Sequence, residues 1–510
     1  MQAVVHICSK ILSSMVVPDA FKLMAECSLG AEVSERLFGL LLSPDVREIT
    51  SIRLNRAKSS LEYNAAAERI FGENLLKPVP WSEGAFYLKT RPEFTFDPLF
   101  NSGAYYVQDA SCMFMESVWQ RIVASSPSDG EEPLISLSKP IYVLDLCAAP
   151  GGKSTILSDL MREAAEGSLL VSNEVIGGRA AVLAENMAKW GDPNVIVTNN
   201  DPSDFKGLHS FFDIVLVDAP CSGEGMFSKS REAVKEWSEE NVALCAARQK
   251  RILSDIWPSL KPGGILIYST CTFNRFENSD NLGFIIDKLG GEEIVLQDSP
   301  FEKLSSNGVI KLSAGGYQFV PPLVEGEGQY FAVVRKADGD RSCSSRGNMG
   351  RGRDKEKLRG FAKGGRKSPM EYAGWVEERR GELMKLYPSA IAGEVGQIGK
   401  SLRVLSSGTA VATLKGKDIV PYADLALSSC RSLLSGYLKE RYGFSYLILE
   451  VSRVEALKFL AKEQLVLPGA PTGYLLLVYG GFALGFVKNL GNRCNSLLPN
   501  ARRIRSALRQ

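Results

Sequence analysis

Histidine is almost absent from this chain, because only His6 and His209 occur among its 510 residues. The sequence therefore disfavours zinc sites with histidine ligands and catalytic Ser-His-Asp triads. The ten cysteines are scattered without a C-x-x-C pair, which argues against a zinc ribbon and against a disulfide framework. We therefore expect reduced thiols, a cytoplasmic location and no metal site.

Long apolar runs are also missing. No stretch of eighteen apolar residues occurs, so no membrane association is expected. The longest candidate, Tyr474–Val487, is interrupted by Gly480 and Gly481 and is better explained as two strands. The first residues are rather apolar, but His6 and Lys10 interrupt them, so a signal peptide is not expected.

The charge is nearly balanced overall but unevenly distributed. The formal net charge is +2, yet the stretch from Arg341 to Lys367 holds ten Lys or Arg against two Asp or Glu. Residues 337–369 are polar and rich in glycine and serine, which predicts a basic flexible linker. Such a linker is usually solvated, and contact with nucleic-acid phosphates is compatible with it.

A chain of 510 residues is too long for one hydrophobic core and predicts several domains. We place an N-terminal helical and small α+β region at 1–115, in which basic residues beside aromatic ones suit RNA binding, and a catalytic domain at 116–336. The linker and a C-terminal module, 370–510, follow. Residues 18–70 carry helical periodicity with a helix start at Ser34, and short strands are expected near Ile52 and between Val79 and Phe96.

Strands and helices alternate from Ile141 onward, which is typical of a doubly wound sheet. The fold class is therefore α/β, with a Rossmann-like catalytic sheet. A last, antiparallel strand is expected at Gln329–Arg335, paired with one near Ile294. The parallel strands that we expect are Tyr142–Leu146, Leu169–Asn173, Val195–Thr198, Ile214–Val217 and Ile265–Ser269.

A tight loop of small residues follows the first of these strands and leads into a helix. It lacks the glycine of a Walker A loop and fails the G-x-G-x-x-G spacing, but a helix N-terminus suits a nucleoside-bearing ligand with a carboxylate. Glu174 follows the second strand, where it can accept hydrogen bonds from ribose hydroxyls, and Asp201 is placed for an adenine amino group. S-adenosylmethionine carries all three groups and is the expected cofactor. The loop residues are Cys147, Ala148, Ala149, Pro150, Gly151, Gly152 and Lys153.

Two thiols and one carboxylate follow the fourth and fifth strands. Asp218 and Cys221 lie in one loop, and Cys271 lies in the other. Because the two strands should be neighbours, we expect both thiols to face one pocket. Lys153 either stabilises a thiolate or orients Asp218. Buried, inert cysteines remain the alternative.

This combination has a rationale in cytosine chemistry. Addition of a thiolate at C6 makes C5 nucleophilic enough to accept a methyl group. A carboxylic acid relieves the charge near N3, and a second thiol can assist when the C5 proton leaves and the protein–base bond breaks. The sequence therefore predicts covalent catalysis on a pyrimidine.

Three blocks, Asp145–Thr155, Asp218–Phe227 and Tyr268–Asn278, resemble motifs of the Sun-type (Nol/Nop/Sun) RNA cytosine-C5 methyltransferases. Two further stretches, Ala483–Lys488 and Leu498–Asn500, resemble the PUA-like RNA-binding part of the bacterial RsmF branch. The resemblance implies that Cys271 is the nucleophile, that Cys221 helps to release the product and that Asp218 contacts the base. The cofactor site that it implies consists of Cys147 through Lys153 with Glu174, Asp201 and Asp218.

The chain departs from the family pattern at three places. Glu277-Asn278-Ser279 stands where the family usually has Glu-Asn-Glu, and Pro321-Pro322 stands where the family often has a Pro-His pair. Cys112 replaces a common serine. None of these changes touches the two thiols, although substrate contacts could differ.

The resemblance implies methylation of a cytidine in small-subunit (16S) ribosomal RNA, so the expected partner of a monomeric protein is this RNA or the small ribosomal subunit. A transfer-RNA methyltransferase stays open, because substrate choice lies in the flanking domains. An RNA-binding ribosome assembly factor with dispensable methylation is the other alternative, which the intact thiols disfavour. Amino-group methylation is weaker still, because the loop Asp218-Ala219-Pro220-Cys221 lacks an N-P-P-Y clamp.

Overall fold

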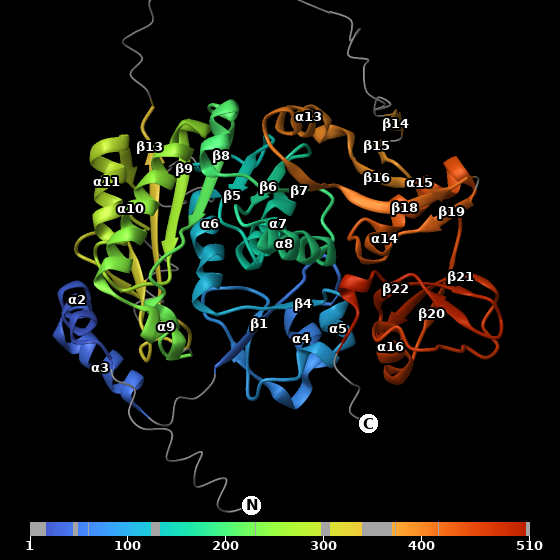
Figure 1. Cartoon of the computed structure of the whole chain (residues 1–510), viewed down its shortest axis with the longest axis horizontal. Helices are drawn as coiled ribbons and strands as arrows, with labels where there is room; N and C mark the ends of the chain where they lie inside the picture. The colour runs from blue at the N-terminus through green and yellow to red at the C-terminus, as the bar shows by residue number, and fades with distance from the viewer. Residues whose placement is uncertain are drawn as a thin grey trace, which may run out of the picture.

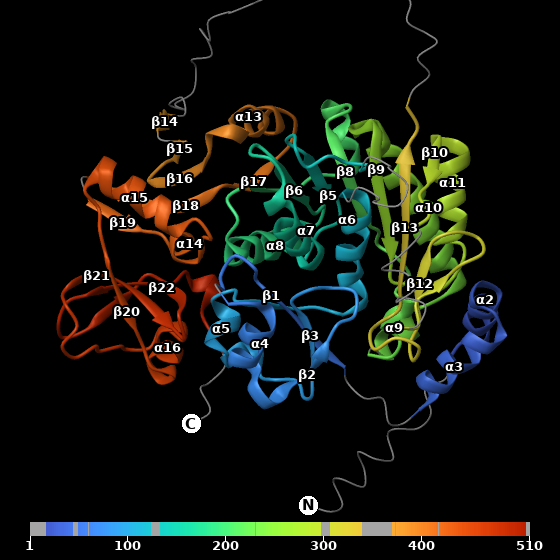
Figure 2. The same ribbon diagram turned by 180° about the vertical axis from the view of Figure 1, so that it is seen from behind.

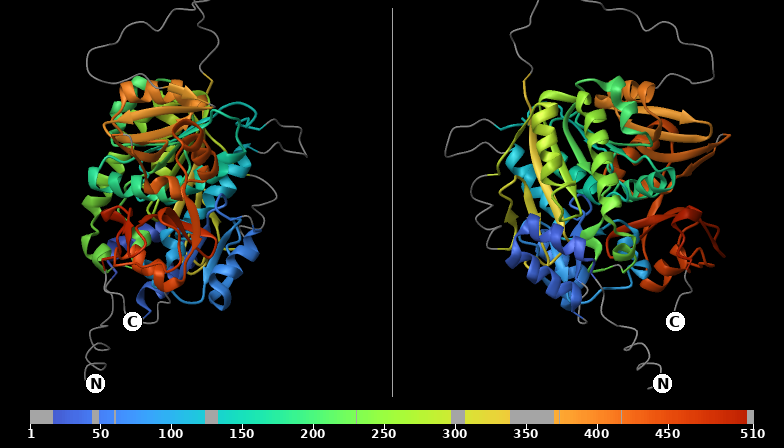
Figure 3. Two further views of the ribbon diagram at one scale, coloured as in Figure 1. Left: turned by 90° about the vertical axis from the view of Figure 1, so that its right-hand side faces the viewer. Right: turned by 60° about the vertical axis from the view of Figure 1, so that its left-hand side comes forward.

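The structure is a computed structural model that describes residues 17–43, 49–59, 61–123, 133–229, 231–296, 307–338, 370–372, 374–416 and 418–505. Nearly all of the predicted linker, 337–369, lies outside the described residues. Figure 1 shows the central sheet between two N-terminal helices at one end of the molecule and the C-terminal strands at the other. The views in Figure 3 agree with this arrangement.

The central sheet has ten strands in the order β11-β12-β13-β9-β8-β5-β6-β7-β17, and β10 pairs with β13. Every residue of β6 and β7 is buried, as expected for strands that are covered on both faces. All five predicted parallel strands are present, and the α/β fold class is confirmed. They are β5 (Tyr142–Asp145), β6 (Leu169–Asn173), β7 (Val195–Thr198), β8 (Phe212–Asp218) and β9 (Leu260–Thr270).

Helices cover both faces of this sheet. Alternate apolar residues of the strands pack against α6, α7 and α8 on one face and against α10, α11 and α13 on the other. This division follows from the two-residue period of a strand. The helices are α6 (Met115–Val123), α7 (Gly152–Leu160), α8 (Gly177–Trp190), α10 (Glu239–Ile256), α11 (Ser279–Leu289) and α13 (Ala392–Ser401). The short helix α9 (Arg231–Glu236) packs instead in the cluster of the two N-terminal helices.

Antiparallel strands extend the sheet at one edge. The predicted last strand is β13 (Gln329–Lys336), which runs antiparallel to β9, and β10 (Gly291–Glu293) pairs with it close to Ile294. Two short strands that were not expected, β11 (Ile310–Lys311) and β12 (Tyr317–Phe319), complete this edge.

The other edge of the sheet shows that the predicted 370–510 module is not separate from the catalytic domain. Its strand β17 (Val404–Ser407) pairs antiparallel with β7, and α13 packs on the sheet through Ile398. A strand of three half-buried residues and one buried serine carries no sign of its distant partner, so sequence periodicity could not place it.

The N-terminal region differs from the predicted helical unit over 18–70. Helices α2 (Asp19–Leu29) and α3 (Ala31–Leu42) are separated by Gly30 at φ +81°, and Ser34 lies buried inside α3 instead of starting it. A four-stranded antiparallel sheet in the order β2-β3-β1-β4 follows. Its elements are β1 (Thr50–Leu54), α4 (Tyr63–Phe71), β2 (Leu75–Pro78), β3 (Ala85–Leu88), α5 (Pro98–Asn101) and β4 (Tyr105–Val107).

The C-terminal strands form two further sheets. The first has the order β14-β15-β16-β18-β19 and the second the order β20-β21-β22-β23. The two strands predicted within Tyr474–Val487 are β21 and β22. The elements are β14 (Met370–Tyr372), β15 (Trp375–Arg380), β16 (Leu383–Pro388), β18 (Thr409–Lys415), β19 (Asp418–Pro421), α14 (Ala423–Leu427), α15 (Arg431–Tyr442), β20 (Leu447–Glu450), α16 (Arg453–Leu460), β21 (Gly473–Tyr479), β22 (Phe482–Asn489) and β23 (Cys494–Ser496).

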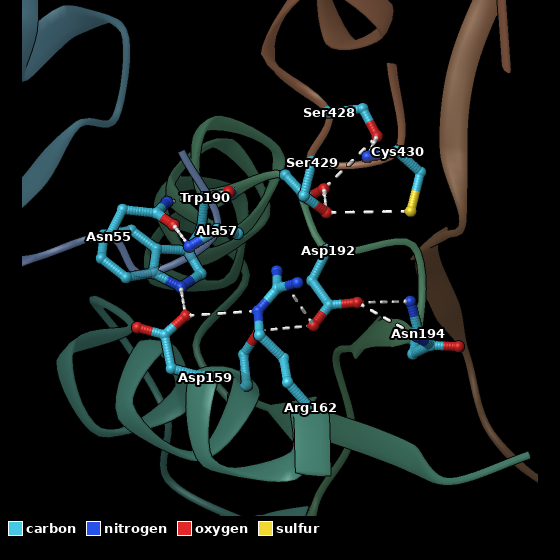
Figure 4. A network of polar contacts seen from close by, with 12 residues as sticks. Asn55, Ala57, Asp159, Arg162, Trp190, Asp192, Asn194, Ser428, Ser429 and Cys430 are labelled. Atoms are coloured by element: carbon cyan, nitrogen blue, oxygen red, sulfur yellow. Dashed lines mark hydrogen bonds and ion pairs between the residues drawn. The ribbon is translucent and has the colours of Figure 1, made fainter. Parts of the chain in front are cut away.

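All three parts of the chain meet at the C-terminal end of α8. The last carbonyl groups of a helix lack partners within the helix. Here they accept hydrogen bonds from both flanking parts, and Figure 4 shows several of these residues, among them Asn55, Trp190 and Ser429, close together. The bonds run from Lys58 Nζ to the Lys189 carbonyl, from Asn55 Nδ2 to the Trp190 carbonyl and from the Ser429 amide to the Gly191 carbonyl.

Candidate active site

Two thiols meet beyond the ends of β8 and β9. These strands are parallel neighbours, with Asp218 opposite Ser269, and Cys221 and Cys271 follow them. The two Sγ atoms lie 2.9 Å apart, and the Cys271 amide donates to Cys221 Sγ over 3.3 Å. As predicted from the strand order, the thiols therefore share one site. The hydrogen bond to Cys271, together with burial, raises the pKa of Cys221 well above its usual value.

Two buried glutamates hold the thiol loops together by reaching across in opposite directions. Glu224, from the Cys221 loop, accepts from the backbone amides of Phe273 (2.7 Å) and Asn274 (3.0 Å). Glu277, from the Cys271 side, accepts from the Ser222 amide over 3.0 Å. The amide group of Asn274 donates to both carboxylates at 2.9 Å.

Side chains from α10 and from the segment that precedes it support these glutamates. The indole of Trp237 donates to Glu224 over 2.9 Å, and Gln249 of α10 donates to Glu277 over 2.8 Å. Burial raises the pKa of Glu277. Sequence motifs did not predict this scaffold, because its partners become neighbours only in the folded chain.

Asp218 and Lys153 form an ion pair beside the thiol loops. The Nζ atom of Lys153, in the first turn of α7, lies 2.8 Å from Asp218 Oδ2. Ser269 Oγ (2.7 Å) and Gln329 Nε2 (3.3 Å) donate to the other oxygen, Oδ1. Burial opposes the charge of Lys153, but the carboxylate of Asp218 outweighs it and raises the pKa of Lys153. Of the two predicted roles of Lys153, the structure favours the one that orients Asp218.

A third thiol, Cys112, lies next to this ion pair. Its Sγ atom is 3.6 Å from Lys153 Nζ and 3.6 Å from Gln329 Oε1. Burial raises the pKa of Cys112 to about 12, so this thiol is neutral at physiological pH. The sequence marked Cys112 only as a departure from the family pattern, and it did not indicate Gln329.

The predicted cofactor loop, Cys147 to Lys153, connects β5 to α7. Gly151, at φ +113°, precedes the helix in a left-handed conformation that a side chain would strain. A Cβ on Gly152 would lie 3.0 Å from Gln108 Nε2. Because β5 pairs with β6 on one side and β8 on the other, the loop lies at the switch point where open α/β sheets bind ligands.

Asp145, the last residue of β5, lies fully buried beneath this loop. Its Oδ2 atom accepts a hydrogen bond from Ser154 Oγ over 2.7 Å, whereas Oδ1 has no partner in the described part of the chain. Burial raises the pKa of Asp145 to about 7. We did not predict this residue as part of the site, although a carboxylate that ends a buried strand was a usable signal.

Glu174 and Asp201 follow β6 and β7, as predicted, but their carboxylates differ in the number of protein partners. Glu174 is buried, and its carboxylate accepts from the Ile176 amide over 2.9 Å at the start of α8. The carboxylate of Asp201 caps the next helical turn and pairs with Arg251 at 3.2 Å. The carboxylate of Asp201 is therefore the one with more contacts to other protein groups.

Neither a metal cluster nor a membrane helix is found in the described ranges. No group of three or more His, Cys, Asp or Glu side chains there is arranged to hold a metal ion. No helix within the same ranges is long and apolar enough to cross a membrane.

Three family models match consecutive parts of the chain. The model described as 16S rRNA methyltransferase RsmB/F matches residues 135–335, which contain both thiols, the ion pair and the cofactor loop. The N-terminal domain of 16S rRNA methyltransferase RsmF matches residues 17–110. The methyltransferase RsmF PUA domain matches residues 446–504, only the last part of the predicted C-terminal module.

Similar proteins carry related names. Ribosomal RNA small subunit methyltransferase F of Aliivibrio fischeri is 32% identical over 332 residues, which cover 63% of this chain and 65% of that protein. The protein of the same name from Klebsiella pneumoniae is 32% identical, with 64% of each chain covered. The matches thus span slightly less than two thirds of these relatives.

One solved structure, the crystal structure of PH0851, supports the fold. It matches with a TM-score of 0.53 at 21% identity and covers 63% of this chain and 66% of its own. The family resemblance drawn from the sequence motifs is confirmed by the three models. Over residues 135–335 the chain thus resembles the RsmB/F methyltransferases, and on either side of this region it matches the N-terminal and PUA domain models of RsmF.

Proposed function

We propose that this protein methylates C5 of a cytidine in RNA through a covalent bond between Cys271 Sγ and C6 of the base. The observation that carries the proposal is the pair of thiols, 2.9 Å apart, beside the Lys153–Asp218 ion pair. A nucleophilic thiol, a second thiol and a hydrogen-bond donor that balances negative charge on the ring are the groups that this chemistry needs.

The residues around the cofactor loop fit S-adenosylmethionine. Asp145 Oδ1 is a buried acceptor without a protein partner in the described ranges, suited to an ammonium group. The α7 N-terminus favours a carboxylate, and Glu174 can accept from ribose hydroxyls. Asp201 would reach the adenine only by sharing its carboxylate with Arg251. The cofactor, when bound, supplies the methyl group.

The nucleophile acts first. The Sγ–C6 bond forms as the C5–C6 π electrons move toward C5 and, through the ring, toward N3. The Lys153 ammonium, which Asp218 holds in place, donates the hydrogen bond that balances this negative charge, and Ser269 and Gln329 position the Asp218 carboxylate. C5 then carries enough electron density to accept a methyl group.

Release of the product reverses the addition. The C5 proton passes to solvent water, the electron pair of the C5–H bond restores the C5–C6 double bond, and the Sγ–C6 bond breaks so that Cys271 departs as a thiolate. The thiol of Cys221 can donate a hydrogen bond to that thiolate from 2.9 Å away, and its raised pKa favours the protonated form that donates. Cys221 therefore assists release.

The substrate that we propose is a cytidine in small-subunit ribosomal RNA, bound in the cytoplasm by a monomeric protein. The description of the matching family model supports ribosomal RNA, and the PUA domain match supports RNA binding outside the catalytic domain. Transfer RNA as substrate, or a role in ribosome assembly without methylation, are outcomes that the same experiment distinguishes.

The test uses purified protein and S-adenosylmethionine with an isotope-labelled methyl group. Ribosomal RNA, transfer RNA and intact small subunits are incubated separately, and their nucleosides are analysed by mass spectrometry. We expect labelled 5-methylcytidine in small-subunit RNA only. Label in transfer RNA would change the substrate but keep the chemistry, and no label in any sample would contradict the proposed activity.

A further inference from the structure

A cavity of about 570 Å³ lies beside the active site. It opens where α3, strands β2 and β3 and the chain after β12 approach one another, and Figure 2 shows these elements on one side of the molecule. Its described lining residues include none that we assign to catalysis or to the cofactor. Pockets for small ligands typically measure about 300–1,000 Å³, so this cavity can hold a nucleoside-sized group.

The walls of the cavity are apolar. Leu76, Tyr87 and Leu88 form the wall from the N-terminal sheet, and Pro321 and Val324 form the opposite wall. Leu76 is 41% exposed, whereas Leu88 and Val324 are buried, so Leu76 lies at the solvent side. The aromatic ring of Tyr87, which lines this wall, suits contact with the face of a base.

The polar part of the cavity carries more negative than positive charge. Lys229 Nζ lies 3.7 Å from Asp109 Oδ2 and forms an ion pair with Glu327. Lys77 pairs with Glu325 at 2.8 Å. Of the charged residues that line the cavity, two are carboxylates, Asp109 and Glu325, and one is a lysine, Lys229, which disfavours a phosphate and favours the N–H groups at the edge of a nucleobase.

The cavity adjoins the proposed position of the target cytidine. Asp109 lines it, and Cys112, three residues further along the chain, lies 3.6 Å from Lys153 Nζ. Three residues span at most about 10 Å. Ser111 Oγ, between them, donates to the Glu327 carbonyl over 2.8 Å and fixes the spacing. One RNA strand can therefore reach both places.

We propose that this cavity binds an unstacked nucleobase of the substrate RNA that neighbours the target cytidine along the strand. An enzyme that attacks a ring carbon must take the base out of its stack, and unstacked RNA bases are recognised by packing on their faces and hydrogen bonding at their edges. The inference rests on the proposed function, and it adds a site that selects the sequence next to the methylated cytidine.

The test combines a filled cavity with a missing base. Leu76→Trp places an indole at the cavity mouth, and Leu244→Trp, at a 64% exposed position of α10, is the matched control. Each full-length protein methylates an RNA oligonucleotide that contains the mapped target cytidine, intact or with one abasic residue at either of the two positions on each side. S-adenosylhomocysteine binding and the melting temperature verify the fold.

We expect one abasic position to raise KM at least tenfold for the wild type and for Leu244→Trp. For Leu76→Trp, KM should already be raised on intact RNA, and the same abasic position should change it no further. The inference would be overturned if Leu76→Trp and the abasic residue raised KM by independent factors at every position. An unchanged KM for Leu76→Trp on intact RNA would also overturn it.

Glu325→Lys gives an independent test at an exposed side chain, which decides the matter if Leu76→Trp does not fold. Reversing this charge should raise KM for intact RNA and leave KM for the critical abasic RNA unchanged. An equal effect on both RNAs would contradict base binding in the cavity. Failure of the proposed function would look different, because the wild type would then methylate no RNA.

Discussion

Cys221 and Cys271 stand 50 positions apart in the sequence, yet their Sγ atoms lie 2.9 Å apart. The parallel pairing of β8 with β9 brings their loops together. Glu224 and Glu277 then fix the separation, because each accepts a backbone hydrogen bond from the opposite loop. Two thiols held this close can form a disulfide with little movement of the backbone.

Mild oxidation should therefore inactivate the protein. Oxidised glutathione should take the two thiols to one disulfide and leave two molecules of reduced glutathione. We expect methyl transfer to be lost and to return with dithiothreitol, and peptide mass spectrometry should find the Cys221–Cys271 link. Cys27→Ala, at an exposed thiol, is the control and should behave as the wild type. Inactivation without this link would contradict the geometry.

Replacing Glu224 should destabilise the protein strongly. In Glu224→Ala, the backbone amides of Phe273 and Asn274 and the Trp237 indole lose their acceptor. Each buried donor without a partner costs about 1–3 kcal/mol, so we expect a loss of about 3 kcal/mol or more in the free energy of unfolding by urea. Glu32→Ala, at an exposed position, should change it by less than about 0.5 kcal/mol. A loss below about 1 kcal/mol for Glu224→Ala would show that Glu224 does not hold the two thiol loops together.

Asp145 should make the cofactor-free protein less stable as the pH rises. Burial raises its pKa from the usual 3.8 to about 7, so the folded state holds this proton more tightly than the unfolded chain does. The contribution to stability is complete below about pH 4 and is lost as the pH rises through 7. The shift corresponds to roughly 4 kcal/mol.

The comparison that checks this prediction is Asp145→Asn against the wild type, by urea unfolding between pH 5 and pH 8. The amide keeps an oxygen for Ser154 but does not titrate. We expect the variant to gain stability relative to the wild type as the pH rises. Parallel curves for the two proteins would show that Asp145 does not titrate in this range.

Arg502 should be needed to hold the PUA domain against the rest of the protein. Its side chain is 7% exposed and pairs with Glu185 of α8 at 2.7 Å and with Asp424 of α14 at 2.6 Å. Arg502→Ala leaves Asp424 as a buried, unpaired charge, which typically costs about 3–5 kcal/mol. Urea unfolding should show this loss, and affinity for RNA should fall more than affinity for S-adenosylhomocysteine. The exposed neighbour Arg503 is the control, and an equal effect of Arg503→Ala would contradict the prediction.

Local sequence was sufficient to predict the catalytic sheet and the meeting of the thiols. Buried parallel strands are continuous apolar runs, and the ends of neighbouring strands meet at one edge, so the positions of Cys221 and Cys271 follow from their place after β8 and β9. The cofactor loop followed from its small residues between β5 and α7.

Contacts between distant segments could not be predicted in this way. The pairing of β17 with β7 joins two segments about 200 residues apart, and nothing in the Val404–Ser407 sequence specifies that partner. The buried Glu224 has the same residue type as many solvated acids, and only the folded chain supplies its donors. Asp145 likewise gains its raised pKa from burial that the tertiary structure creates.

The central claim is that Cys271 forms the covalent bond and that Cys221 helps to break it. The most direct test incubates Cys221→Ala and Cys271→Ala with small-subunit RNA and S-adenosylmethionine, denatures the mixtures and maps any RNA-bound peptide by mass spectrometry. We predict a stable adduct at Cys271 in Cys221→Ala, and neither adduct nor methyl transfer in Cys271→Ala. An adduct at Cys221 in Cys271→Ala, with none in Cys221→Ala, would contradict the assignment and reverse the two roles.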